Sequence, residues 1–557
     1  MIHVVEISGE RETAMNKLPK LPIGIQTFEK LRREGYLYVD KTRYLVDLID
    51  NGAVYFLSRP RRFGKSLTVS TFDALFSGKK ELFRGLYAEE FMNRSGYQIS
   101  PVIHLDMSNL TTNMGLDFLR DSLLERVREN ACQLGISVES STPGDAFYSL
   151  MKNAAAKYKT SAVLLIDEYD SPILQNIYDP SKAECSREVL RDFYIRIKAA
   201  DKNLRFVFIT GISKFTKMGV FSALNSLKDI SAKDKYAAML GYTEGELLSN
   251  FDGYLDKTAM KRNETKNKLV AQIRDYYDGF SFDGHTRVYN PFSTLNFFYD
   301  MEFADYWFES ATPSSLLDYI KRHDLEAEAF RGCEAHENFT SVAEIERASP
   351  ESFLFQSGYL SVRKKEGKKL ILDYPNMEVL SSLTQLFLYG KFHLEGFAAE
   401  AGDLEKALSN GDAEVLVRMY DRLLMTIPYD VYGREERKYE EANASPKYKV
   451  YALAESFYHA LLFSMLWSSC IHTTAENHSY KGRSDIEAEH NGRCYVIELK
   501  IAEGNEAAQK AAEAAICQIH KKGYTDKYIG KDVTIVGIAV DRVSRRVGAS
   551  KIETRST

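Results

Sequence analysis

Residues 58–66 bring together side chains and backbone groups that could hold a phosphate. The stretch reads SRPRRFGKS and lies between an apolar run at 53–57 and a helix-like run at 67–76. A loop that ends in Gly-Lys-Ser at a helix N-terminus binds anions, because its N–H groups and the helix dipole both attract negative charge. Lys65 would reach the terminal phosphates and Ser66 would bind Mg²⁺. The usual pattern G-x-x-x-x-G-K-[ST] needs a glycine where this chain has Arg59, so the site needs support from elsewhere.

That support comes from an acidic pair after the apolar run at 162–166, namely Asp167 and Glu168. In P-loop ATPases an aspartate in this position holds the Mg²⁺ shell, and the glutamate that follows orients the attacking water as a base. An ordinary strand that ends in a polar turn would look the same. With a Gly-Lys-Ser loop that also leaves a strand, the pair predicts a site for ATP and Mg²⁺.

The next apolar run, at 206–209, ends in a polar segment that includes Thr210, Ser213 and Lys214. A polar residue at the end of this strand can sense the γ-phosphate, so Thr210 and Ser213 are both candidates, with Lys214 as a charge donor. A simple capping turn explains the same residues equally well.

A second group of reactive side chains lies at 482–500, around the dipeptide Asn491-Gly492. This dipeptide is the strongest short signal for a two-residue hairpin turn. With the turn there, cross-strand partners have numbers that sum to 983, so Asp485 lies opposite Glu498. Lys500 then lies on the same face, because side chains alternate along a strand.

This arrangement predicts a metal-dependent nuclease centre. Two opposed carboxylates repel each other, and a divalent cation between them removes that cost. Lys500 would position a water or stabilise charge on a phosphate, as in the D…E-x-K motif of PD-(D/E)XK nucleases. An exposed hairpin with charges facing water remains an alternative, since Glu487 and Glu489 share the face of Asp485. A bulge would also break the register.

The elements around the first site indicate a parallel α/β sheet. Strands are expected at 54–57, 102–105, 162–166 and 206–209, with helices between them, for example at 117–133 and 188–200. A strand fits between the two motifs, which suits the additional-strand (AAA/STAND-like) branch of P-loop NTPases.

Helices dominate from residue 242 to about 439, for example at 257–277 and 377–389, and a small β unit is expected at 353–362 with 369–372. Near the C-terminus a helix at 505–522 and a buried strand at 533–540 follow the hairpin. Together with the hairpin, these elements predict a restriction-endonuclease-like α/β domain.

The length of 557 residues suggests three domains of about 150 residues or more. We expect an N-terminal extension at 1–17 and an AAA-like P-loop ATPase domain at 18–241. A helical lid and connecting region, with a winged helix as one option, should occupy 242–440, and the PD-(D/E)XK nuclease-like domain 441–557.

Composition points to a soluble globular protein rather than a polycation, since 44% of residues are hydrophobic, 27% are charged and the net charge is −5. The six cysteines form no C-x-x-C pair, which argues against a structural zinc or a disulfide framework. The N-terminus does not look like a signal peptide, and the longest apolar run, near 460–467, is too short to span a bilayer. We therefore expect a cytoplasmic protein without membrane association.

Several motifs resemble the bacterial AAA-ATPase-like family that carries a C-terminal PD-(D/E)XK nuclease-like domain. The resemblance covers almost the whole chain after Lys17, and an arginine at the place of Arg59 is the usual form in that family. The motifs are LPIGIQ at 21–26, YVDKT at 38–42, RPRRFGKS at 59–66, DEYD at 167–170, FSALN at 221–225, YDGF at 277–280 and YNPF at 289–292.

The resemblance implies roles for further residues. Glu455, on a helix before the hairpin, would help to bind metal, and Gln518 on the later helix could contact the site. Nucleotide-binding residues are expected to be Arg59, Arg62, Gly64, Lys65, Ser66, Leu67, Asp167 and Thr210. Metal ligands are expected to be Ser66 and Asp167 in one site and Glu455, Asp485 and Glu498 in the other. The catalytic residues would be Glu168, Asp485, Glu498 and Lys500.

The three loop arginines leave two alternatives open. One of Arg59, Arg61 and Arg62 could act as an arginine supplied in cis to the phosphates, or all three could face solvent.

The first functional hypothesis is an ATPase coupled to a Mg²⁺-dependent nuclease that cuts nucleic acid, DNA rather than RNA, with a homo-oligomer as a further option. The alternative is an ATP-dependent switch or scaffold whose nuclease-like domain only binds a partner. The near-neutral charge of 441–557, with 16 Lys and Arg against 14 Asp and Glu, favours this alternative. Nucleotide binding without turnover is a third reading.

Overall fold

The chain folds into two compact units. In the computed structural model the first unit comprises residues 1–312 and 332–376, and the second comprises 313–331 and 377–557. The region predicted as one middle domain, 242–440, thus divides between the units near Asn376. The structure describes residues 18–110, 115–176, 179–213, 226–311, 316, 319, 330–340, 348–392, 397–427, 457–459, 461–467, 469, 471–479 and 482–555.

A five-stranded parallel sheet forms the centre of the first unit, with the strand order β2-β3-β4-β1-β5. Strand β4 therefore lies between β1 and β3, which is the topology of the additional-strand P-loop class. All four predicted strands are present. The strands are β1 (Val54–Ser58), β2 (Val102–Asp106), β3 (Ala162–Asp167), β4 (Leu204–Gly211) and β5 (Lys228–Asp229).

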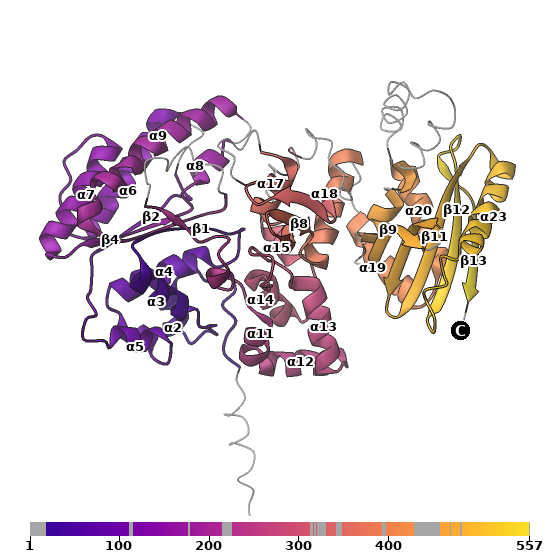
Figure 1. The fold of residues 1–557 in the computed structure, drawn as a ribbon, viewed down its shortest axis with the longest axis horizontal. Coiled ribbons are helices and arrows are strands. Elements are labelled where there is room, and N and C mark those ends of the chain that lie inside the picture. Colours follow the sequence, from indigo (N-terminus) through magenta and orange to yellow (C-terminus); the bar gives the residue numbers. More distant parts are fainter. Residues whose placement is uncertain are drawn as a thin grey trace, which may run out of the picture. The chain divides into compact units, whose positions relative to one another are not determined.

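Helices cover both faces of this sheet (Figure 1). On one face lie α6 (Leu116–Gln133), α7 (Pro143–Tyr158) and α9 (Pro180–Ala199), which share one buried apolar cluster with β2, β3 and β4. On the other face lie α2 (Phe28–Arg33), α3 (Thr42–Asn51), α4 (Lys65–Phe76) and α5 (Ala88–Met92). Shorter elements are η1 (Lys80–Phe83), α8 (Ser171–Leu174), η2 (Asp201–Asn203) and η3 (Asp234–Tyr236).

The rest of the first unit is helical with a small antiparallel sheet of order β6-β8-β7. Its helices are α11 (Glu244–Asn250), α12 (Asp252–Arg262), α13 (Lys266–Tyr277), α14 (Pro291–Asp300), α15 (Tyr306–Ala311) and α17 (Pro350–Ser357). Its strands are β6 (Cys333–His336), β7 (Ser361–Glu366) and β8 (Lys369–Asp373).

Two local predictions in this part were confirmed only in part. Residues 369–373 form the expected strand β8, which pairs with β7. The expected β unit at 353–362 begins as helix α17, because Ser349 caps its N-terminus, Pro350 suits the first turn and Gly358 ends it in a left-handed conformation. The segment at 257–277 is helical as expected, and it is divided between α12 and α13, since Asn263 takes a positive φ of 53° and ends α12.

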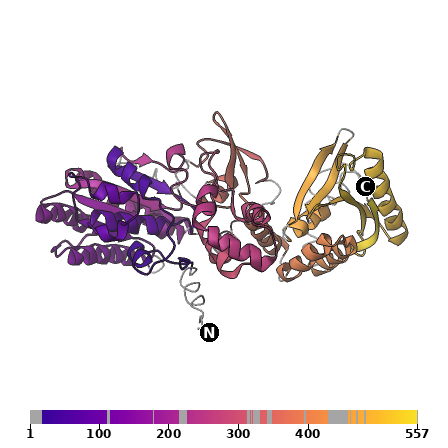
Figure 2. The ribbon, with the colours of Figure 1, turned by 90° about the horizontal axis from the view of Figure 1, so that it is seen from below.

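The second unit contains a mixed five-stranded sheet of order β13-β12-β11-β10-β9, in which only β11 and β12 are parallel. Helix α23 (Asn505–Lys522) connects them and covers one face, while α19 (Phe397–Ser409) and α20 (Ala413–Thr426) cover the other (Figure 2). The remaining helix is α18 (Met377–Phe392), and the strands are β9 (His472–Ser479), β10 (Gly482–His490), β11 (Arg493–Ala502), β12 (Asp532–Asp541) and β13 (Arg546–Arg555).

The predicted hairpin register is confirmed for residues 486–490 of β10 and 493–497 of β11. Asn491 and Gly492 have φ values of 47° and 80°, as a two-residue hairpin turn requires. The strand pairs run from Ile486 opposite Ile497 to His490 opposite Arg493, each with the predicted sum. The side chains expected in the core, Ile486, Ala488, Tyr495, Ile497 and Leu499, are all buried.

Among the residues that the structure describes, no helix is both long enough and apolar enough to cross a lipid bilayer.

Candidate active sites

The phosphate-loop candidate folds around the ammonium group of Lys65. Its Nζ donates to the carbonyl oxygens of Arg59 and Pro60, both at 2.9 Å, and the side chain is buried. Burial lowers the pKa of Lys65, and the nearby carboxylates of Glu168 and Asp167 partly oppose this shift. The ammonium group of Lys65 is thus a buried cation that two neutral carbonyls hold.

The loop leaves space and donors for an anion. Gly64 precedes α4 with a φ of 92°, which favours glycine, and a Cβ there would meet no described atom within 4 Å. Ser66 and Leu67 lie in the first turn of α4, half-buried, where backbone N–H groups have no acceptor within the helix. These residues fit a phosphate bound at the positive end of the helix dipole.

Asp167 and Thr210 meet at the ends of the neighbouring strands β3 and β4. The Thr210 hydroxyl donates to the Asp167 carboxylate, and the Glu168 N–H donates to the same oxygen at 3.1 Å. Of the two candidates for sensing phosphate, the structure brings Thr210 to the predicted metal ligand. Ser213 instead donates to Asp170 at 2.7 Å, and Lys214 lies outside the described residues.

Glu168 has the environment of a general base. It follows β3 with a φ of 52°, an uncommon conformation for a non-glycine residue. Burial raises its pKa, while the charge of Lys65 lowers it and the carboxylates of Asp167 and Asp170 raise it further. A raised pKa makes this carboxylate a stronger proton acceptor.

The arginines of the loop differ from the expectation. Arg59 was predicted to bind nucleotide, but its guanidinium is 1% exposed and donates to the carbonyls of Ser231 at 2.6 Å and Tyr236 at 3.4 Å. This placement favours a role in holding the loop, and the alternative that all three arginines face solvent does not hold. Arg61 and Arg62 are exposed, and the Arg62 guanidinium lies over the ring of Phe292 at 5.0 Å.

Asp170 is a buried residue whose role the sequence did not reveal. Its carboxylate accepts the N–H groups of Ser213 at 2.7 Å and Ile212 at 3.2 Å, so it ties the end of β3 to the end of β4. Burial raises its pKa, and these hydrogen bonds lower it. The sequence did contain a signal for this residue, because Asp170 is the last residue of the DEYD motif at 167–170.

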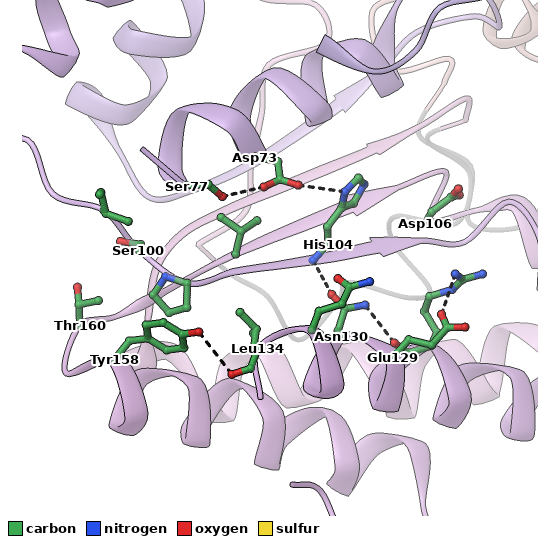
Figure 3. A pocket seen from close by; sticks show the side chains of 15 residues that line it. Asp73, Ser77, Ser100, His104, Asp106, Glu129, Asn130, Leu134, Tyr158 and Thr160 are labelled. Atoms are coloured by element: carbon green, nitrogen blue, oxygen red, sulfur yellow. Dashed lines mark hydrogen bonds and ion pairs between the residues drawn. The ribbon is translucent and has the colours of Figure 1, made fainter. Parts of the chain in front are cut away.

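A cavity of about 700 Å³ opens along the edge strand β2 (Figure 3). His104 lies 3.8 Å from Asp73, and its N–H donates to Asn130. At one end lies Asp106, which pairs with Asp167 in the sheet register. The cavity therefore extends toward the strand ends that carry Asp167, and no sequence motif indicated it.

The second candidate site lies on β10 and β11. The paired residues of β10 and β11 end at Ile486 and Ile497, one position before Asp485 and Glu498. The N–H of Leu499 donates to the Asp485 carboxylate at 2.9 Å. Asp485 and Glu498 are close enough for Asp485 to raise the pKa of Glu498. Burial raises the pKa of Glu498 more than the charge of Asp485 does, and the charge of Lys500 lowers it. The resulting pKa of Glu498 is about 7.

Glu498 offers one oxygen to a ligand. It is fully buried, and its Oε1 accepts hydrogen bonds from Lys500 at 2.9 Å and from Gln518 on α23. Its Oε2 is buried without a hydrogen-bond partner among the described residues. A buried carboxylate oxygen without a donor beside a second carboxylate fits a divalent cation.

Two of the carboxylates on this face, Glu487 and Glu498, are buried, while Asp485 and Glu489 are half-buried. Glu487 is 2% exposed, and it accepts hydrogen bonds from Lys527 and from the Tyr528 hydroxyl at 2.8 Å. The alternative of an exposed hairpin therefore does not hold for Glu487 or Glu498.

One neighbour of the site was not predicted. A ring nitrogen of His459 lies 2.8 Å from the carbonyl oxygen of Asp485. The predicted metal ligand Glu455, four residues earlier in the sequence, lies outside the described residues. Among the described residues, no three Asp, Glu, His or Cys side chains gather as a metal-binding group. The described part of this site holds two carboxylates, those of Asp485 and Glu498.

Comparisons with known proteins fit both sites. A family model described as "Predicted AAA-ATPase" matches residues 22–221, and a model of the PD-(D/E)XK nuclease superfamily matches residues 453–549. The chain is also 34% identical over 542 residues to an uncharacterized protein in the vnfD 5′ region of Azotobacter chroococcum mcd 1. That alignment covers 96% of this chain and 99% of the relative.

Proposed function

Because this chain belongs to the AAA-ATPase-like family with a C-terminal PD-(D/E)XK nuclease domain, we propose that it is an ATPase coupled to a metal-dependent nuclease. The observation that carries the nuclease half is the buried carboxylate of Glu498, which has Asp485 and Lys500 beside it and one oxygen without a partner in the part of the chain that the structure describes. Such a group is costly to bury unless a ligand compensates it.

In the ATPase site, Lys65 exchanges its two carbonyl acceptors for the terminal phosphates of ATP, where it stabilises the charge that develops during transfer. Ser66 and Asp167 would hold Mg²⁺, which supplies charge neutralisation. Glu168 accepts a proton from the attacking water. Thr210 fixes the Asp167 carboxylate through its hydroxyl.

In the nuclease site, Asp485 and Glu498 would hold Mg²⁺, which polarises the phosphodiester and lowers the pKa of a bound water. Lys500 lies beside Glu498 at 2.9 Å, and it would stabilise charge on the phosphate or position the attacking water. Gln518 orients the Glu498 carboxylate from α23. Glu455 remains proposed as a further ligand.

The wider setting is also part of the proposal. The substrate would be a nucleic acid, DNA in preference to RNA, and the ATP state would control the nuclease. The protein would act in the cytoplasm, and a homo-oligomer is compatible with this activity.

Two measurements on the purified full chain test both halves. Phosphate release from ATP should be lost in Lys65→Ala, and calorimetry should show Mn²⁺ binding in the wild type that Glu498→Ala loses. Wild-type protein that does not hydrolyse ATP, or that does not bind Mn²⁺, would overturn the proposal of a coupled ATPase and nuclease.

The alternative of a switch or scaffold is favoured by the near-neutral charge of residues 441–557. A binding module needs no metal, so this alternative predicts ATP hydrolysis together with no heat of Mn²⁺ binding in the wild type. The same calorimetry therefore separates the two functions.

A further inference from the structure

Side chains from distant parts of the first unit hold the outer side of the phosphate loop. The Arg59 guanidinium donates through Nη1 to the carbonyls of Ser58 at 3.0 Å and Ser231 at 2.6 Å, and through Nη2 to Tyr236 at 3.4 Å. The same group lies 3.9 Å from the centre of the Phe282 ring. Planar guanidinium groups stack on aromatic rings in this way, and lysine cannot reproduce the geometry.

A second contact holds the loop two residues later. The indole Nε1 of Trp307 donates to the carbonyl of Arg61 at 3.1 Å, and the indole is 1% exposed. Gly358 lies against both parts, because a Cβ there would stand 2.7 Å from Pro60 and 3.0 Å from Trp307. The loop is thus fixed through its backbone as well as through Arg59.

The inner side of the same peptides holds Lys65. Its ammonium group donates to the carbonyl of Arg59, whose side chain is anchored, and to the carbonyl of Pro60, which lies between the two anchors. The anchors therefore set the position of both acceptors. Burying a guanidinium on backbone carbonyls carries a desolvation cost, which indicates that the arrangement of this loop matters.

We propose that Arg59 is a positioning residue for nucleotide binding. Together with Trp307 it fixes residues 59–61 so that the Lys65 ammonium can pass from their carbonyls to a phosphate. This inference rests on the proposed function, because it assigns a role within the proposed ATP site. It also accounts for the missing first glycine of the usual pattern, because the Arg59 side chain holds the loop backbone through its contacts with Ser231, Tyr236 and Phe282.

The test uses the full chain with the variants Arg59→Ala, Arg59→Lys and Trp307→Phe. Arg128→Ala, at an exposed position of α6, is the control. Fluorescence titration with ATP and with ADP gives affinity, and hydrogen exchange of residues 58–66 without nucleotide gives loop order. We expect roughly tenfold weaker binding of both nucleotides in Arg59→Ala, the size of one lost charge-assisted hydrogen bond.

The variant Arg59→Lys distinguishes a positioning role of Arg59 from direct contact with the phosphate. We expect Arg59→Lys to resemble Arg59→Ala, because the charge remains but the fork and the stacking are lost. Trp307→Phe should weaken binding in the same direction, and hydrogen exchange at 58–66 should accelerate in all three variants but not in the control. Wild-type affinity in Arg59→Lys and Trp307→Phe would show a charge role instead and overturn the proposal.

The hydrogen-exchange measurement also distinguishes a failure of this inference from a failure of the proposed function. If wild-type protein binds no nucleotide, the proposed function fails, and exchange alone then decides whether the anchors order the loop. Unchanged exchange in Arg59→Lys and Trp307→Phe would overturn the inference in that case too. Melting temperatures within about 3 °C of wild type exclude general unfolding. If Arg59→Ala does not fold, the milder variants Arg59→Lys and Trp307→Phe test the inference.

Discussion

Lys65 and Glu168 are charged side chains taken out of water in one site, and each affects the proton affinity of the other. Burial lowers the pKa of Lys65 and raises that of Glu168, and their mutual attraction opposes both shifts. An ATP phosphate would take the place of the carbonyls around Lys65 and leave Glu168 facing the attacking water. The roles of the two residues should therefore separate experimentally.

We expect Glu168→Gln to retain ATP binding while its hydrolysis rate falls by about 10²–10⁴-fold, because the amide cannot accept a proton. Lys65→Ala should instead lose affinity, by roughly 10–100-fold for a lost charged hydrogen bond. Equilibrium binding and single-turnover hydrolysis measure the two effects. Equal loss of affinity in both variants would contradict these roles.

Glu498 should make metal-free stability depend on pH. Its pKa is about 7 in the folded protein against an ordinary value of 4.5, so the folded state binds more protons than the unfolded state between these values. The free energy of unfolding should therefore fall as pH rises from about 4.5 to 7, by on the order of 3 kcal/mol at most, with no further loss above that range.

Metal binding should follow the opposite trend. Since Mn²⁺ needs the ionised carboxylate, its affinity should rise with pH up to about 7, by up to about tenfold per unit. Denaturation and calorimetry across this range test both trends. Glu498→Gln should flatten the stability curve and lose the metal, and an unchanged pH profile in this variant would show that another group titrates.

At the level of single residues, sequence reasoning reached the motif side chains but not all of their partners. Asp485 and Glu498 could be placed together because a two-residue turn fixes the pairing of their strands, and Gln518 could be assigned to the site only through the family resemblance. The neighbours His459 and Trp307 could not, since each reaches its site from a distant segment without a motif of its own. The buried position of Arg59 likewise depends on carbonyls about 170 residues later.

Among the elements, α23 packs closely against β12 beside the proposed metal site. Gly537 pairs with Glu498 in the parallel register, and a Cβ there would stand 2.6 Å from the carbonyl oxygen of Ala512 on α23. Close approach of a helix backbone to a strand requires such a glycine. Gln518 reaches Glu498 from this same helix.

We expect Gly537→Ala to displace α23, to destabilise the second unit by about 1–3 kcal/mol and to weaken Mn²⁺ binding. Chemical denaturation and calorimetry measure the two effects. Gly245→Ala on α11 is the matched control, because a Cβ there meets no described atom within 4 Å. Wild-type stability and metal affinity in Gly537→Ala would show that the helix position is not critical.

Regular elements were predictable where local signals agreed. The hairpin register followed from turn chemistry and the two-residue period of side chains, and the parallel strands followed from apolar runs bounded by polar turns. The segment around Phe353 failed because its apolar residues fit a short helix or a strand, and its caps decide for helix.

For the whole molecule, the structure places the two sites in separate compact units. Each site is built from residues of its own unit, so a variant in one should leave the local chemistry of the other intact. We expect Lys65→Ala to change the ATP dependence of nucleic-acid cleavage without abolishing Mn²⁺ binding. Cleavage that is identical with and without ATP in wild-type protein would show that the sites are not coupled.

A cleavage assay with purified full-length protein tests the proposed nuclease activity most directly. Single- and double-stranded DNA and RNA would be incubated with Mg²⁺ or Mn²⁺, with and without ATP. We expect metal-dependent cleavage of at least one substrate by the wild type and its loss in Lys500→Ala. Absence of cleavage of every substrate, in wild-type protein that still hydrolyses ATP, would contradict the proposed nuclease activity.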